Sequence, residues 1–133
     1  MKTVYSCLLV VLIAITLACG YGSKNYNTAP AAGSIPAISE LSPDNTSAGG
    51  TAFSITVNGS NFVSSAKVNW NGVAQKTTFV TGNQLMVTIP ASMISSPGTA
   101  QISVTNPATT GSGPYGMGGV LAETSKAVKF TIN

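Results

Sequence analysis

The residues that could move protons are few in this sequence. The chain of 133 residues has three carboxylates, Glu40, Asp44 and Glu123, and it has no histidine. A serine or threonine nucleophile needs a base beside it, and hydrolysis of a sugar needs two carboxylates that face each other. Only an approach of Glu40 or Asp44 to Glu123 could supply such a pair. The sequence therefore favours a non-catalytic protein over an enzyme.

Metal coordination has equally few candidate ligands. Structural zinc sites use four cysteines or histidines, and the chain offers two cysteines, Cys7 and Cys19. Glu40, Asp44 and Asn45 could supply oxygen ligands to calcium, although a turn at Asp44 and Asn45 is the simpler interpretation. We expect neither a metal nor another cofactor.

Charge and composition exclude a further class of function. Charged residues make up 7% of the chain, against about 25% in an ordinary domain. The net charge of +3 comes from scattered lysines without arginine, whereas nucleic-acid binding favours clustered cations and the bidentate guanidinium group. We expect no nucleic-acid partner. A hydrophobic content of 44% with 14 glycines and 7 prolines predicts a folded chain with many turns.

The N-terminal segment has the composition of an export signal. Lys2 provides a positive charge, and residues 4–18 are mainly apolar or small. This apolar stretch is shorter than the roughly 20 residues that a membrane-spanning helix needs. Residues 1–18 are therefore predicted to be a signal peptide, and Cys7 leaves with it.

The end of this signal carries a recognisable motif. Its residues Leu17-Ala18-Cys19-Gly20, preceded by Ile15-Thr16, resemble the lipobox of bacterial lipoproteins. The resemblance implies cleavage before Cys19, a diacylglycerol on the Cys19 sulfur and an exported protein held at a membrane of the cell envelope. Anchors with two or more acyl chains are stable. Gly20 would suggest the outer membrane in a two-membrane bacterium. A conventional secretory signal with an incidental cysteine is the alternative.

A tether and one strand-rich domain follow the signal. Residues 19–34 are rich in Gly, Ser, Asn, Ala and Pro without apolar periodicity, and predict a lipidated N-terminus with a flexible tether. Residues 35–133 instead show apolar residues at every second position, the pattern of half-buried strands. The strands are predicted at 36–42, 52–58, 66–70, 73–80, 84–90, 99–106 and 126–132.

These strands predict an all-β fold. About seven short strands fit an immunoglobulin-like two-sheet β-sandwich, and Asn71-Gly72 predicts a tight hairpin. Trp70, in phase with Val68, is expected at the centre of the core. The aromatic residues expected to serve the fold are Trp70, Phe53, Phe62, Phe79 and Phe130.

Several motifs resemble the IPT/TIG domain over residues 35–133. The specific ones are Gly49-Gly50-Thr51, the alternating run from Ile55 to Val57, Gly59-Ser60-Asn61-Phe62 and Val68-Asn69-Trp70-Asn71-Gly72. The resemblance implies an immunoglobulin-like sandwich of the E-set type, as found in bacterial surface proteins, plexin-type receptors and some starch-acting enzymes. The glycines are expected to act structurally: Gly49 and Gly50 at a positive-φ turn and Gly59 at a bend.

The segment 107–125 is longer than this family commonly places before its last strand. Connections beyond about 12–15 residues are usually functional or disordered. Tyr115, Met117, Val120 and Leu121 give it an apolar character, which can mark a contact surface. The alternative is a glycine-rich loop without a contact. In an immunoglobulin-like sandwich it should lie at the same end as the loop at 61–65.

The sequence thus predicts a lipid-anchored bacterial cell-envelope protein that displays one domain as a protein-interaction or spacer module. Its first partner is the membrane, reached through Cys19. A protein of the envelope would be contacted by an edge strand or by the segment 107–125. The alternative is a module that binds cell-surface polysaccharide, which would need exposed aromatic side chains.

Overall fold

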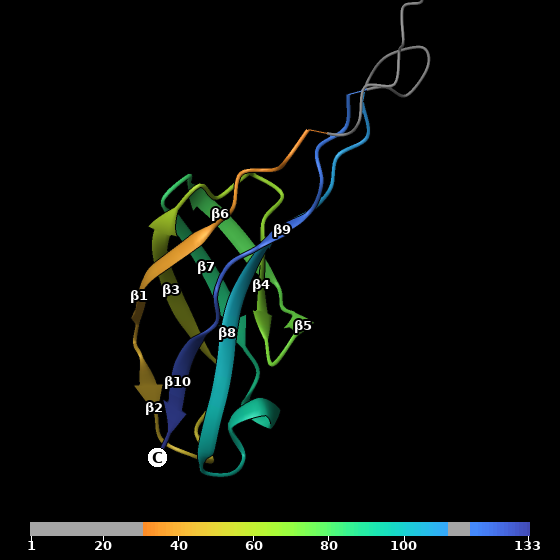
Figure 1. The fold of residues 1–133 in the computed structure, drawn as a ribbon. Coiled ribbons are helices and arrows are strands. Elements are labelled where there is room, and N and C mark those ends of the chain that lie inside the picture. The colour runs from red at the N-terminus through yellow and green to blue at the C-terminus, as the bar shows by residue number, and fades with distance from the viewer. Residues whose placement is uncertain (1–30, 112–117) are drawn as a thin grey trace, which may run out of the picture.

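Two β-sheets pack face to face in the computed structural model, which describes residues 31–111 and 118–133 (Figure 1). A four-stranded sheet has the order β1-β3-β7-β6, and a six-stranded sheet has the order β2-β10-β8-β4-β5 with β9 paired to β8. The elements are β1 (Ala37–Ser42), β2 (Asn45–Thr46), β3 (Phe53–Ser60), β4 (Lys67–Trp70), β5 (Val73–Ala74), β6 (Thr77–Thr81), β7 (Gln84–Ile89), the 3-10 helix η1 (Ala91–Ile94), β8 (Gly98–Asn106), β9 (Glu123–Thr124) and β10 (Val128–Ile132). The prediction of an all-β, immunoglobulin-like sandwich is confirmed.

The predicted strand at 73–80 is wrong, because the structure divides this segment between the two sheets. The Asn71-Gly72 hairpin forms as expected, but β5 extends for only two residues beside β4. The backbone of Val68 in β4 is instead hydrogen-bonded to residues that follow β5. The Gln75 N–H donates to the Val68 carbonyl (2.8 Å), and the Val68 N–H donates to the Thr77 hydroxyl (2.9 Å). The chain then joins the four-stranded sheet as β6, beside β7.

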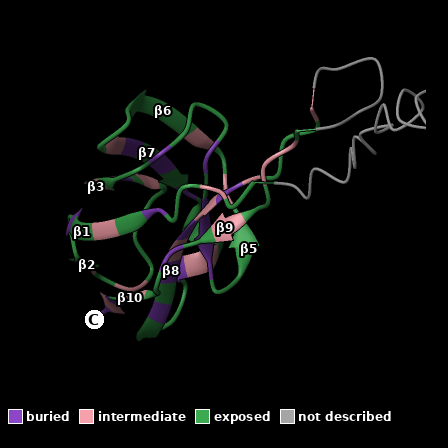
Figure 2. Cartoon of the chain, turned by 45° about the horizontal axis from the view of Figure 1, so that its top comes forward, coloured by how far each residue is buried: buried purple, intermediate pink, exposed green. Residues whose placement is uncertain are grey.

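The core fills the space between the two sheets (Figure 2). Phe130 is fully buried, and its ring centroid lies 5.3 Å from that of Trp70 and 5.9 Å from that of Phe53. The prediction that Trp70 belongs to the core is confirmed, because it is 4% exposed. Phe79, also expected to serve the fold, is instead 38% exposed. The reason is its position on β6, the last strand of the four-stranded sheet.

Two glycines of the family motif have different roles in the structure. Gly49 has a φ of +71° and forms the expected positive-φ turn. Gly59, expected at a bend, lies within β3 opposite Ile38. A Cβ atom there would collide with the carbonyl oxygen of Ala37 and lie 2.6 Å from the Phe62 ring. Gly59 is therefore needed for close packing between β1, β3 and the loop that follows.

The two ends of the described chain lie at opposite ends of the sandwich (Figure 1). At the end near the C-terminus, the Ala48 N–H donates to the carbonyl of Asn133 and the Gly49 N–H to that of Ile94, both at 2.7 Å. Residue 31 lies beyond the opposite end, on a narrow extension. A chain held from its N-terminus would therefore be held at one end of the long axis.

Candidate functional site

The narrow extension is built from three segments, 31–36, 107–111 and 118–122, which we call the stalk (Figure 1). The Ala31 N–H donates to the Gly119 carbonyl (3.0 Å), and the Leu121 N–H donates to the Ala31 carbonyl (3.1 Å). Thr109 and Val120 exchange two further backbone hydrogen bonds, of 2.9 and 3.0 Å. Ala31, in the segment assigned to the flexible tether from the sequence, thus pairs with the 118–122 arm of the long connection between β8 and β10, and Thr109 pairs with the other side of that arm.

Two glycines allow the stalk segments to approach each other closely. A Cβ atom on Gly119 would collide with the carbonyl oxygen of Thr109. A Cβ atom on Gly33 would lie 2.5 Å from the carbonyl oxygen of Leu121 and 2.8 Å from the Cγ atom of Glu123. Close backbone approach is a common reason for glycine at a given position. Gly33 and Gly119 therefore help to define the structure of the stalk.

We expect Gly119→Ala to open the stalk. The added methyl group would push the arm that carries Val120 away from Thr109 and break the two backbone hydrogen bonds between them. Hydrogen exchange should then accelerate at residues 107–111 and 118–122 while the amides of β3 stay protected, because local openings are independent of the core. Gly98→Ala is the matched control, since a Cβ atom added at Gly98 would have no neighbouring atom within 4 Å. Unchanged exchange in Gly119→Ala would contradict the described stalk.

Asn106 fixes the base of the stalk to the sandwich. It is the last residue of β8 and is 4% exposed. Its side-chain amide donates to the carbonyls of Ser34 (2.8 Å) and Asn61 (2.7 Å), and its Oδ1 accepts from the Val63 N–H (3.3 Å). Every polar atom of this buried side chain thus has a partner. The prediction that the long connection lies at the same end as the loop at 61–65 is confirmed.

Asn61 adds a second link between the same segments. Its backbone has a φ of +60°, a conformation that asparagine tolerates better than most residues. Its side-chain amide donates to the Ile35 carbonyl (3.1 Å). The segment 31–35 is therefore hydrogen-bonded to the rest of the described chain at Ala31, Ser34 and Ile35.

The predicted binding residues of the long connection are only partly described. Val120 is half-buried between Ala31 and Thr109, with which it forms two bridges. Leu121 is 51% exposed. Tyr115 and Met117 lie outside the described residues, as does the predicted lipidation site Cys19.

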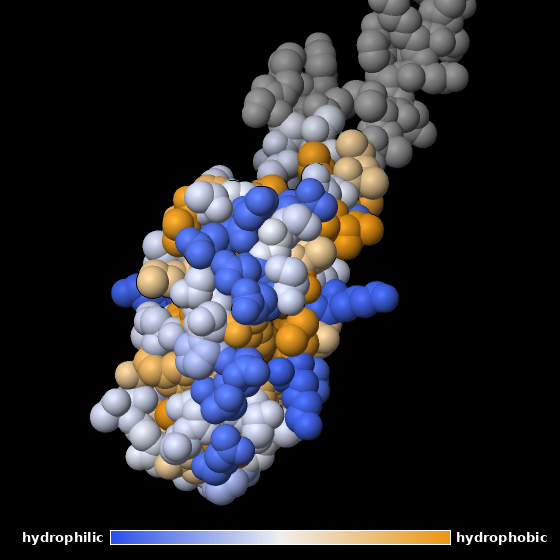
Figure 3. Space-filling view, turned by 90° about the vertical axis from the view of Figure 1, so that its left-hand side faces the viewer, coloured by the Kyte–Doolittle hydropathy of each residue, from blue (hydrophilic) through white to orange (hydrophobic). Residues whose placement is uncertain are grey.

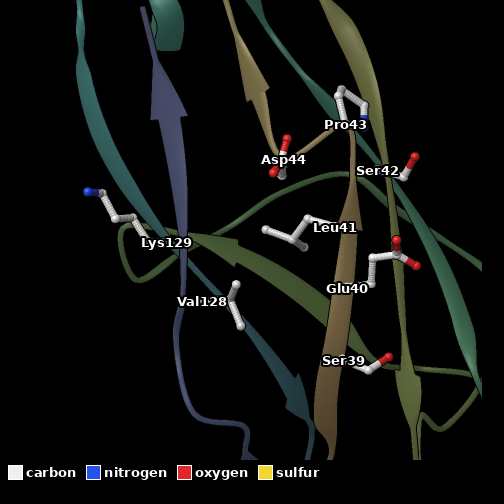
Figure 4. A pocket seen from close by; sticks show the side chains of 8 residues that line it. All are labelled: Ser39, Glu40, Leu41, Ser42, Pro43, Asp44, Val128 and Lys129. Atoms are coloured by element: carbon white, nitrogen blue, oxygen red, sulfur yellow. The ribbon is translucent and has the colours of Figure 1, made fainter.

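A second candidate site, which sequence reasoning missed, is a shallow groove between β1 and β10 (Figure 3). Leu41 and Val128 point toward each other across it, whereas Glu40 and Lys129 point to opposite sides (Figure 4). The Glu40 carboxylate accepts from the Asn58 amide (3.3 Å). The strand pattern could not reveal the groove, because it does not say which strands end the sheets.

The groove does not assemble the chemistry considered from the sequence. Glu40 and Asp44 line it, but Glu123 lies on β9, against Gly33 of the stalk. The carboxylate pair needed for sugar hydrolysis is therefore not formed between these residues. In the described part of the chain, no three Asp, Glu, Cys or His residues gather as metal ligands would. The groove is better suited to a backbone contact along the outer edge of β1, which ends the four-stranded sheet.

The topology and the stalk define an immunoglobulin-like module that is tied to its own N-terminal segment. The family model for the IPT/TIG domain matches residues 36–117, and the chain belongs to this family. The matched region ends before β10, which completes the six-stranded sheet. No curated protein matches the sequence. Within residues 31–111 and 118–133, no helix has the length and apolar character required to cross a bilayer.

Proposed function

We propose that this chain is a lipid-anchored protein of the bacterial cell envelope whose IPT/TIG domain serves as a protein-interaction or spacer module without catalysis. The observation that carries the proposal is the stalk. The segment that leads from Cys19 is hydrogen-bonded to the domain at Ala31, Ser34 and Ile35. An anchor on Cys19 would therefore hold the domain by one end of its long axis and direct the opposite end away from the membrane.

The distance between anchor and domain follows from the length of the tether. Residues 20–30 lie between Cys19 and Ala31. This length spans roughly 40 Å when fully extended and about 20 Å as a flexible coil. The domain would thus lie close to the membrane surface, within reach of other proteins of the envelope.

The outer edge of β1 and the groove beside it are the contact site that we favour for a protein partner. An extended peptide can add a strand to such an edge, with backbone hydrogen bonds for affinity and side-chain pockets for specificity. The polysaccharide alternative would need exposed aromatic side chains. Among the described residues, Phe79 is the exposed aromatic, at 38%, while Trp70, Phe62 and Phe130 are buried. The described part of the chain thus favours a protein partner over a sugar.

Metabolic labelling with a palmitate analogue tests the anchor. We expect the exported protein to incorporate the label and the Cys19→Ser variant to lose it. Cys7→Ser is the matched control and should label normally, because Cys7 is predicted to leave with the signal peptide. Label that persists in Cys19→Ser would contradict the proposed anchor.

A further inference from the structure

The exposed apolar side chains are unevenly distributed over the molecule. The large hydrophobic residues that are at least 36% exposed in the described chain are Ile35, Val63, Val73, Phe79, Val80, Met86 and Leu121. Four of these seven lie on the stalk or on segments bonded near its base: Ile35 and Leu121 on the stalk, and Val63 and Val80 on the loop and strand beside it. We call these four residues the apolar pole.

Hydrogen bonds show that the segments bearing the apolar pole are neighbours. The Phe62 N–H donates to the Gly82 carbonyl (2.9 Å), which joins the loop of Val63 to the turn that follows Val80. Asn106 then joins the loop of Val63 to the tether segment that leads into Ile35. Ala31 joins that segment to Leu121. Four segments that are distant in sequence therefore lie next to one another at this end of the molecule.

The opposite end of the sandwich differs in composition. It is formed by the turn at 47–52, the connection at 95–98 and the C-terminal residue Asn133. None of the exposed large hydrophobic residues in the described chain lies there. The residues at 95–98 are two serines, a proline and a glycine. Among the described residues, large exposed apolar side chains are thus found at the stalk end and not at the opposite end.

Charged residues near the apolar pole are compatible with anionic lipid headgroups. Lys67 is exposed at the start of β4, where it pairs with Thr105, the neighbour of Asn106. Lys126 is exposed and lies two residues after the end of β9. Glu123 on β9 is the carboxylate in the same region and is half-buried. Lysines beside a membrane surface are attracted by anionic headgroups.

We infer that the apolar pole contacts the lipid bilayer and orients the anchored domain on it. This inference rests on the proposed function, because the tether would hold the pole within about 20 Å of the lipid on Cys19 as a coil. The tether leaves the domain at this same end, through the stalk (Figure 1). Apolar side chains at a membrane interface bury surface without crossing the bilayer. The opposite, polar end would face away from the lipid.

A fluorescent label placed at each end of the domain tests this contact. Val63→Cys and Ser96→Cys each introduce one thiol into the full protein, whose two native cysteines are removed with the signal peptide or acylated. The lipidated variants are coupled to an environment-sensitive dye and reconstituted in vesicles of phosphatidylethanolamine and phosphatidylglycerol. We expect emission at a shorter wavelength and quenching by spin-labelled lipid at position 63, with neither effect at position 96.

Surface variants provide the matched comparison. In the Val63→Cys background, Val80→Gln with Leu121→Gln should abolish the wavelength shift, whereas Val73→Gln should leave it unchanged. Val73 is 60% exposed, but it lies on β5, away from the apolar pole. Equal signals at positions 63 and 96 would overturn the inference. So would a shift at position 63 that requires an added envelope protein and does not occur in lipid alone.

Mass measurement of Cys19 separates this inference from the proposed function. If Cys19 carries no lipid, the proposed anchor fails. The labelled variants are then made in a Cys19→Ser background and added to the same vesicles. A shift at position 63 alone would still support the lipid contact, and its absence would overturn it.

Discussion

Replacing Phe130 by alanine is expected to destabilise the domain by about 3–5 kcal/mol. The side chain is fully buried and contacts both Trp70 and Phe53, so its removal would leave a cavity between the two sheets. A domain of this size has a total stability of about 5–15 kcal/mol, so the loss is a large part of it. Urea denaturation of the chain from residue 20, followed by Trp70 fluorescence, measures the effect.

Phe79→Ala is the matched control for the loss of an aromatic ring. Phe79 is 38% exposed on β6, so its truncation should cost much less, about 1 kcal/mol or below. A cost as large as that of Phe130→Ala would mean that the described exposure of Phe79 is wrong.

Asn106→Leu is expected to have the second largest effect on the domain. Leucine has a similar size but forms none of the three hydrogen bonds that Asn106 makes to Ser34, Asn61 and Val63. A buried polar group without a partner costs about 1–3 kcal/mol, and we expect a total loss of about 3 kcal/mol. Hydrogen exchange should accelerate at residues 31–36 and 61–63 together, because one side chain holds both segments.

Asn58→Leu is the control for this substitution. Asn58 also forms side-chain hydrogen bonds, to Glu40 and Gln84, but on the more exposed surface of the four-stranded sheet. Water can replace these bonds, so we expect a loss below about 1 kcal/mol. If Asn106→Leu left the exchange at residues 31–36 unchanged, Asn106 would not be the residue that holds the tether segment.

The alternating pattern predicts the buried face of the long strands correctly. Ile55 and Val57 on β3, and Leu85 and Val87 on β7, are all buried, because a side-chain period of two reports directly which face of a strand meets the core. The same pattern does not say which sheet a strand joins. That is why it predicts the segment 73–80 as one strand, and why Phe79 is counted among the aromatic residues that serve the fold.

The stalk could not be predicted for a different reason. Ala31 and Val120 are far apart in the sequence, and neither carries a local signal of strand pairing. The glycine-rich composition around them suggests flexibility, although Gly33 and Gly119 are positions where a side chain would not fit. Glycine can make a segment flexible or allow two backbones to approach closely. Only the atoms around it in the folded structure show which of the two applies.

The intact mass of the protein isolated from the membrane fraction decides whether the domain is held by a lipid. We expect a chain that begins at Cys19 and whose mass is increased by a diacylglyceryl group and an N-linked acyl chain. An unmodified Cys19, or a chain that keeps residues 1–18, would contradict the proposed lipid anchor.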